Sequence, residues 1–166
     1  MPSPLLDRIT IVNITLFLEA AMLLVATLWI WISQINLLPS LHLSKNALII
    51  SIFAGIGTAC SGFMLLFLAG LFKNSFKWLN SLHTIIMEEI APLFIELTFT
   101  DIVLISLASG FCEEVFFRGI VQQQLGLLPT SILFGFFHCP SPRHLSYGLW
   151  ALAAGLFFWL VTRVDR

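Results

Sequence analysis

The chain has 166 residues, of which 58% are hydrophobic and 10% charged, with a formal net charge of -1 and a mean hydropathy of +0.98. A soluble domain needs more polar surface than this, so the composition favours a membrane protein. The Lys and Arg residues are scattered singly, which argues against a nucleic-acid surface. Cys60, Cys112 and Cys139 show no CxxC spacing, so neither a disulfide framework nor a zinc ribbon is predicted.

Two long apolar segments predict the first membrane-spanning helices. Residues 11–32 and residues 47–72 each exceed the about 20 residues that a helix needs to cross a bilayer. The first segment is longer than a signal-peptide core and has no clear cleavage pattern near its end, so we expect an uncleaved span.

The later segments are more varied. Charged residues are interspersed through residues 76–100, which predicts an amphipathic helix at the membrane interface, broken near Pro92. Residues 102–125 predict a further span, and residues 129–138 and 147–162 predict two shorter helices. The expected fold is therefore all-α: one membrane domain over residues 1–166, a polytopic helix bundle of about four to five spans plus the interfacial helix. Lys and Arg divide almost evenly between the two sides, so no orientation is predicted.

A cluster of charged residues interrupts the span at residues 102–125. A charge at the centre of a span costs about 2.5 to 3.5 kcal/mol, and this span carries Glu113, Glu114 and Arg118 within six positions. The i, i+4 spacing of Glu114 and Arg118 predicts an ion pair. Glu113 lies about 100° further round the helix, which predicts a carboxylate facing a polar cavity. From spacing alone, an ion-pair network that only fixes helix packing is an equally good interpretation.

His138 is the second candidate for chemistry, because it ends an apolar run in which Phe134 lies one helical turn earlier. A histidine here is expected to share a water molecule with Glu113. A carboxylate in a low-dielectric pocket binds a proton more readily, and an adjacent imidazole accepts that proton, which together allow general-base activation of water. Nearby glycines allow close helix approach: Gly110, Gly119 and Gly135.

The pattern Glu113-Glu114-x-x-x-Arg118, followed by Phe134-x-x-x-His138, resembles the first two motifs of a membrane-embedded protease family. This is the CAAX prenyl endopeptidase and bacteriocin-processing family, also called the type II CAAX protease or abortive-infection group. The resemblance implies that Glu113 and His138 orient and activate the attacking water. It also implies that Glu114, Arg118 and Phe134 support the site, and that no metal or other cofactor is required.

The resemblance further implies a peptide substrate in the bilayer, either a lipidated CAAX protein or a leader peptide. The family pattern includes a third motif, a His followed three residues later by Asn or a similar polar residue, and this sequence lacks it. His144 is too close to His138 to supply it. In the family these residues are thought to hold the oxyanion, and one such donor is typically worth about 100- to 1,000-fold in rate.

Two interpretations of this departure remain open. The chain is either a truncated enzyme whose last helices are missing, or a non-catalytic member that acts as a membrane scaffold, an immunity factor or an interaction partner. A proton or ion conductor is a weaker third interpretation, because a pathway would need polar positions on other spans. His83, Glu88 and Glu89 match no metal-ligand spacing and are expected to lie on a solvated helix face.

Overall fold

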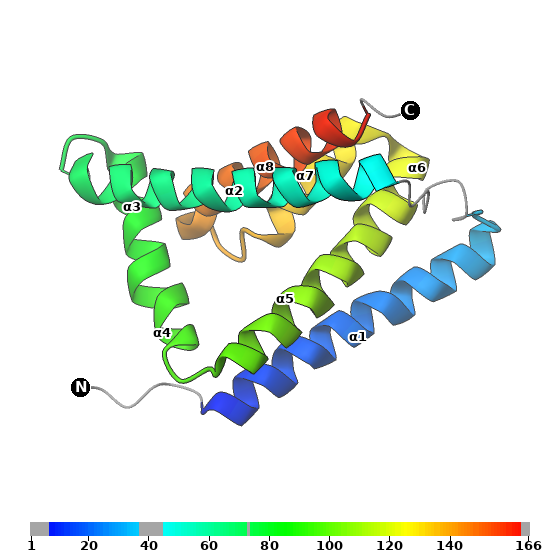
Figure 1. Ribbon diagram of the computed structural model, residues 1–166, viewed down its shortest axis with the longest axis horizontal. Coiled ribbons are helices and arrows are strands. Elements are labelled where there is room, and N and C mark those ends of the chain that lie inside the picture. Colours follow the sequence, from blue (N-terminus) through cyan, green and yellow to red (C-terminus); the bar gives the residue numbers. More distant parts are fainter. Residues whose placement is uncertain (1–6, 37–44, 73, 164–166) are drawn as a thin grey trace. The chain divides into compact units, whose positions relative to one another are not determined.

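The structure is a computed structural model that describes residues 7–36, 45–72 and 74–163. Over these residues the chain forms helices and no strand, so the predicted all-α class is confirmed. In chain order the elements are α1 (Arg8–Ser33), α2 (Lys45–Phe72), α3 (Lys77–Thr84), the π-helix η2 (Ile85–Ile90), α4 (Ala91–Phe94), α5 (Phe99–Glu113), the π-helix η3 (Glu114–Val121), α6 (Gln122–Leu125), α7 (Leu127–Phe137), the 3₁₀ turn η4 (Pro142–His144) and α8 (Leu145–Arg163) (Figure 1).

The elements divide into two compact units. The first unit comprises Met1–Leu37 and Met87–Gln124, and the second comprises Leu38–Ile86 and Leu125–Arg166. The first unit therefore holds α1, α4, α5 and η3, and the second holds α2, α3, α7 and α8.

In the first unit, α1 packs along α5 and η3 with the two chain directions parallel (Figure 1). Three contacts between the helices establish the direction, because the residue numbers rise together on both sides. Arg8 pairs with Asp101 at one end, and Ser109 donates a hydrogen bond to Glu19 further along. The remaining contact is an edge-to-face pair of Trp29 with Phe116. Parallel neighbours require the intervening chain to return to the end at which α1 begins.

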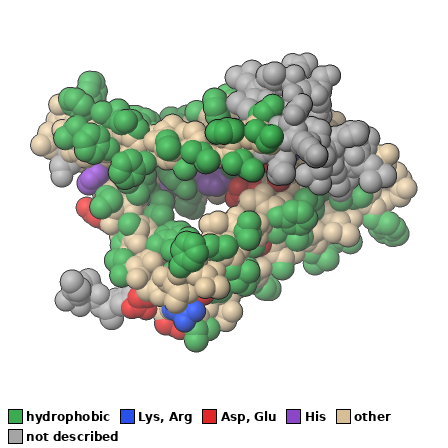
Figure 2. Space-filling view, in the orientation of Figure 1, with side chains coloured by type: hydrophobic (Ala, Val, Ile, Leu, Met, Phe, Trp, Pro, Cys, Tyr) green, Lys and Arg blue, Asp and Glu red, His purple; other side chains and the backbone are tan. Residues whose placement is uncertain are grey.

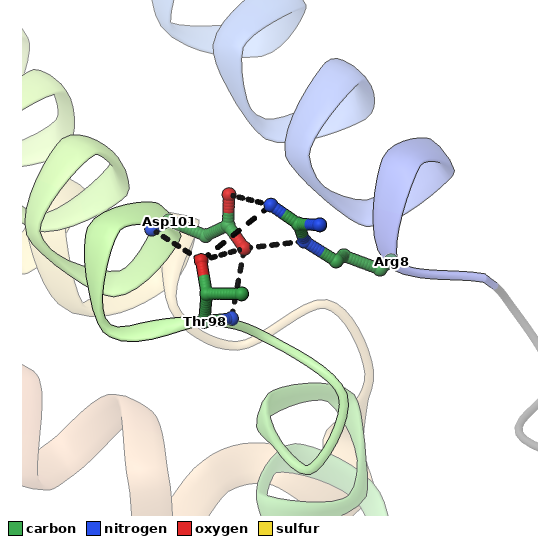
Figure 3. A network of polar contacts seen from close by, with 3 residues as sticks. All are labelled: Arg8, Thr98 and Asp101. Carbon is green, nitrogen blue, oxygen red and sulfur yellow. Dashed lines mark hydrogen bonds and ion pairs between the residues drawn. The ribbon is translucent and has the colours of Figure 1, made fainter.

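A network of polar contacts ties the beginnings of α1 and α5 together (Figure 3). Arg8 binds the Asp101 carboxylate through Nε at 2.6 Å and Nη2 at 3.0 Å, a bidentate geometry. Asp101 also accepts from the Thr98 backbone N–H at 2.8 Å, and the Thr98 hydroxyl accepts from the Asp101 backbone N–H at 3.3 Å. This reciprocal capping box satisfies two N–H groups at the start of α5. The same carboxylate thus caps α5 and anchors α1.

In the second unit, α7 packs closely against α8, and α2 packs against α3 and α8. The closest approach is at Gly135 of α7 and Gly148 of α8. A Cβ built on Gly135 would lie 2.8 Å from the Gly148 carbonyl oxygen, and one built on Gly148 would lie 2.7 Å from the Gly135 carbonyl oxygen. The expectation that Gly135 permits close helix approach is therefore confirmed.

Apolar side chains are spread over the visible face of the described residues (Figure 2). On α1 alone, Phe17, Trp31 and Ile32 each leave more than 70% of their surface exposed. By length and composition, α1 and the Ile52–Phe72 part of α2 can cross a membrane. The consecutive helical segments Lys77–Phe94 and Phe99–Leu125 meet the same criteria only as a bent pair, a broken span or a re-entrant loop. Exposed apolar area on this scale belongs in lipid, so the chain is a membrane protein.

Two details differ from the helices expected from sequence. The run expected over residues 76–100 ends at Phe94, and Pro92 lies in the first turn of the short helix α4, where a missing N–H is tolerated. The span expected over residues 102–125 is helical throughout most of its length but changes from α to π geometry at Glu114 and back to α at Gln122.

Candidate active site

The acidic motif lies where helix geometry changes. Glu113 is the last residue of α5, and Glu114 opens η3, which continues to Val121. Past its end, the Gln122 backbone N–H donates to the Phe117 carbonyl, which is the five-residue hydrogen-bond spacing of a π-helix. Such turns are rare and occur frequently at functional sites. The coincidence of this turn with the motif supports a functional role for the segment.

The ion pair expected from the i, i+4 spacing is present within η3. The Arg118 guanidinium donates through Nη1 to Oε2 of Glu114. The Glu114 side chain is more than half exposed, whereas that of Arg118 is about a quarter exposed. Glu113, one position earlier, is half-buried. The two adjacent carboxylates therefore differ in exposure, and a polar cavity at Glu113 stays a prediction.

His138 lies at the C-terminal end of α7 in the second unit, where its imidazole has a fixed orientation. Its Nδ1 lies 2.8 Å from the Phe134 carbonyl oxygen, which also accepts a hydrogen bond from the His138 backbone N–H at 3.3 Å. Because a carbonyl oxygen can only accept, Nδ1 must carry the proton in this hydrogen bond. In the neutral imidazole, Nε2 is then the nitrogen that can accept a proton.

Aromatic rings extend from His138 along the same unit. The Phe134 ring centroid lies 4.4 Å from the His138 ring centroid. On α8, the Tyr147 ring centroid lies 6.0 Å from the His138 ring centroid. Tyr147 in turn stacks with Trp150 at 6.0 Å. These contacts hold the imidazole between α7 and α8. The predicted supporting residue Phe134 is therefore adjacent to His138 through both its ring and its carbonyl group.

A hollow of about 210 Å³ in the second unit shares Trp150 with this aromatic row. The hydroxyl groups that line it already donate to backbone carbonyls of α2, Thr58 to Ala54 and Ser61 to Thr58. The hollow therefore offers mainly apolar surface. Its remaining lining residues are Ala153, Ala154 and Phe157.

The structure places Glu113 in the first unit and His138 in the second. Their action on one water molecule therefore stays a prediction. Within each unit, the described residues do not bring three His, Cys, Asp or Glu side chains together in a metal-binding arrangement. Glu88 and Glu89 lie in the π-helix η2.

Sequence reasoning missed a polar contact beside the motif, because Glu19 was counted as part of an apolar run. The Ser109 hydroxyl of α5 donates to Glu19 Oε1 at 2.6 Å, across 90 positions of sequence. The buried Cys112 lies three positions after Ser109 and so on the same face of α5. The sequence alone could have pointed to Glu19, because a carboxylate inside a span has the same free-energy cost that made Glu113 a candidate.

A match to a known protein family covers both sequence motifs. Residues 95–166 match the family described as "Type II CAAX prenyl endopeptidase Rce1-like". This part of the chain is therefore similar to that family. The matched residues include the whole of η3 and α7, and so every candidate residue inferred from the motifs. Neither the comparison with curated proteins nor that with solved structures gives a match.

This match confirms the resemblance drawn from Glu113-Glu114-x-x-x-Arg118 and Phe134-x-x-x-His138. The α1 segment, with Glu19, lies outside the matched residues.

Proposed function

We propose that this chain is a multi-pass intramembrane endopeptidase of glutamate type, in which Glu113 and His138 activate a water molecule. The observation that carries the proposal is the family match over residues 95–166, which includes both residues. The geometry of each residue in its own unit supports it. Glu113 adjoins a π turn, and His138 is held in the tautomer that leaves Nε2 able to accept a proton.

In the proposed reaction, the attacking water donates its hydrogen bonds to the Glu113 carboxylate and to His138 Nε2. One of these groups takes a proton as the water oxygen adds to the peptide carbonyl carbon. The tetrahedral intermediate then collapses, the carbon–nitrogen bond breaks, and the proton passes to the departing amine. The hydrogen bond from Nδ1 to the Phe134 carbonyl keeps Nε2 directed to the water throughout.

The Glu114–Arg118 pair has a structural role in this proposal. It neutralises the Glu114 charge next to Glu113. The π turn keeps both residues of the pair on one segment, η3, directly after Glu113. The substrate class follows from the family: a peptide whose scissile bond reaches membrane depth, as in a prenylated CAAX terminus or a membrane-associated leader peptide.

The direct test uses the purified chain in detergent, with a prenylated CAAX peptide and a leader-peptide library as substrates. The parent chain should cleave at least one substrate, and Glu113→Gln should lose the activity while unfolding at the parental temperature. Glu96→Gln is the matched control, because Glu96 is an exposed carboxylate of the first unit. Cleavage should persist in EDTA. Retained activity in Glu113→Gln would remove Glu113 from the mechanism.

A second candidate function is a non-catalytic family member that binds a membrane partner. The observation that favours it is the sequence after His144, which contains no histidine to form the third motif. The same assay separates the two. This candidate predicts no cleavage of any substrate, and prenyl-peptide binding that is equal in the parent chain and in Glu113→Gln.

A further inference from the structure

A second carboxylate lies within the membrane-spanning part of the first unit. Glu19 is in the middle of α1, the most apolar candidate span. Its Oε1 accepts the hydrogen bond from Ser109, whereas Oε2 is buried and accepts none from the residues that the structure describes. A buried acceptor without a hydrogen bond costs about 1 to 3 kcal/mol. One hydroxyl group is therefore too little to account for this side chain.

The position of Glu19 connects it to the candidate site. Ser109, Cys112 and Glu113 have the i, i+3, i+4 spacing that puts three side chains on one face of α5. Ser109 directs this face towards α1, because it donates to Glu19. Glu113 lies one helical turn after Ser109 on this face, so its side chain is on the side of α5 that meets Glu19.

Helix geometry brings the two carboxylates closer than the sequence spacing suggests. The Cα–Cβ bonds of an α-helix tilt towards its N-terminus, so the Glu113 side chain leans back over the turn that holds Ser109. Glu19 is held against that turn. A buried water molecule needs about three hydrogen bonds from buried polar groups, and Glu19 Oε2 with the Glu113 carboxylate can supply two acceptors.

We propose that Glu19 is a positioning residue for Glu113. Ser109 fixes one oxygen of Glu19, and the other holds the Glu113 carboxylate through one bridging water molecule across the α1–α5 interface. Glu19 thus orients the carboxylate that activates the attacking water without touching the substrate. The inference rests on the proposed function, and it extends the site to a helix outside the family match.

Two other pairs of charged groups in the first unit satisfy each other. On α5, Asp101 pairs with Arg8 at the far end of the interface. On η3, Glu114 and Arg118 pair with each other.

The kinetic test compares Glu19→Leu, Glu19→Gln, Ser109→Ala and the control Glu96→Gln. Glu19→Leu should lower kcat about 10- to 100-fold with KM nearly unchanged, because a misplaced group loses rate rather than binding. Glu19→Gln, which keeps the hydrogen bonds, should recover most of kcat. It should also move the acidic limb of the kcat/KM profile to lower pH, because a negative charge near Glu113 is gone. An active parent with kcat unchanged in Glu19→Leu would overturn the inference and leave the proposed function standing.

A cross-linking test measures how close position 19 lies to Cys112 and does not depend on enzyme activity. In a background with Cys60→Ser and Cys139→Ser, Glu19→Cys should form a disulfide with the native Cys112 under mild oxidation, detected by mass spectrometry of the digested chain. Phe17→Cys is the matched control, because Phe17 is 72% exposed on α1. Absence of the Glu19→Cys cross-link, or equal cross-linking of Phe17→Cys, would overturn the placement. A chain that cross-links as expected but cleaves nothing would contradict the proposed function and, with it, the positioning role.

Discussion

Charged side chains in the first unit lie in contacts that offset the cost of membrane depth. Arg8 binds Asp101 with two hydrogen bonds, and Arg118 binds Glu114 within one turn. Glu19 differs from these pairs, because one of its two oxygens is buried without a hydrogen bond from a described residue. A group that breaks the pattern of its neighbours is a reason to look for function, since unpaired buried polar atoms are uncommon in folded proteins.

Replacing Arg118 with Leu should destabilise the protein, because it leaves the Glu114 carboxylate at membrane depth without its partner. We expect a loss of about 1 to 3 kcal/mol in the free energy of unfolding. Thermal unfolding in detergent, followed by tryptophan fluorescence, measures the change. The double variant Glu114→Leu/Arg118→Leu should regain most of the loss. A single variant as stable as the parent would show that water, not Arg118, solvates Glu114.

Sequence reasoning worked at the residue scale where the partners are close in the chain. The Glu114–Arg118 pair follows from i, i+4 spacing, and Phe134 and His138 are likewise one turn apart. The contact of Glu19 with Ser109 spans 90 positions and depends on which helices pack together. No local pattern carries that information, although the cost of a carboxylate in a span indicated that Glu19 needs a partner.

At the scale of elements, the π-helix was the feature that sequence could not predict. The apolar residues among positions 114–121 are compatible with an α-helix and with a π-helix. The spacing of apolar residues in a sequence does not reveal where a helix turn contains one extra residue. The consequence is geometric. Positions beyond Glu114 are rotated relative to an uninterrupted α-helix, so a prediction of which residues face the core would fail from there onwards.

Glycine substitutions should separate close packing from simple helix propensity. Gly135→Ala should destabilise the second unit by about 1 to 3 kcal/mol, because its Cβ would meet the Gly148 carbonyl oxygen at 2.8 Å, and backbone cannot move aside cheaply. Gly110→Ala is the matched control, since a Cβ there meets nothing within 4 Å. It should be neutral or stabilise the helix by up to about 1 kcal/mol. Thermal unfolding of the two variants measures both effects, and an equal loss in each would contradict the close approach of α7 and α8.

At the scale of the whole molecule, the parallel direction of α1 and α5 constrains how the chain crosses the membrane. Both helices begin at the same end, where Arg8 meets Asp101. If each crosses the bilayer, the chain between them crosses an odd number of times. The helix α2 is long and apolar enough to supply one such crossing. An interfacial position of residues 76–100 stays a prediction.

This topology predicts the accessibility of single cysteines in a background without the native ones. Asp7→Cys and Glu96→Cys should react with a membrane-impermeant maleimide from one side of sealed vesicles. Gln34→Cys, just past the end of α1, should react from the opposite side. Labelling of Asp7→Cys and Glu96→Cys from opposite sides would contradict the parallel arrangement within a membrane.

Composition and apolar run length were sufficient to predict an all-α membrane protein, because both reflect the solvent of the chain rather than its tertiary contacts. The motifs were sufficient to predict the family that residues 95–166 match. The packing partner of each span was not predictable. Lipid does not select between apolar helix faces, so pairing depends on small residues and a few polar contacts such as Gly135 with Gly148.

The central claim is that Glu113 and His138 act on one water molecule, and the most direct measurement is the cleavage rate of a double variant. Glu113→Gln and His138→Ala should each lower kcat by about 1,000-fold or more, and the double variant should be no slower than the slower single variant, because residues that act as a unit do not contribute additively. Losses that multiply in the double variant, or a single variant with the parental rate, would contradict a shared role.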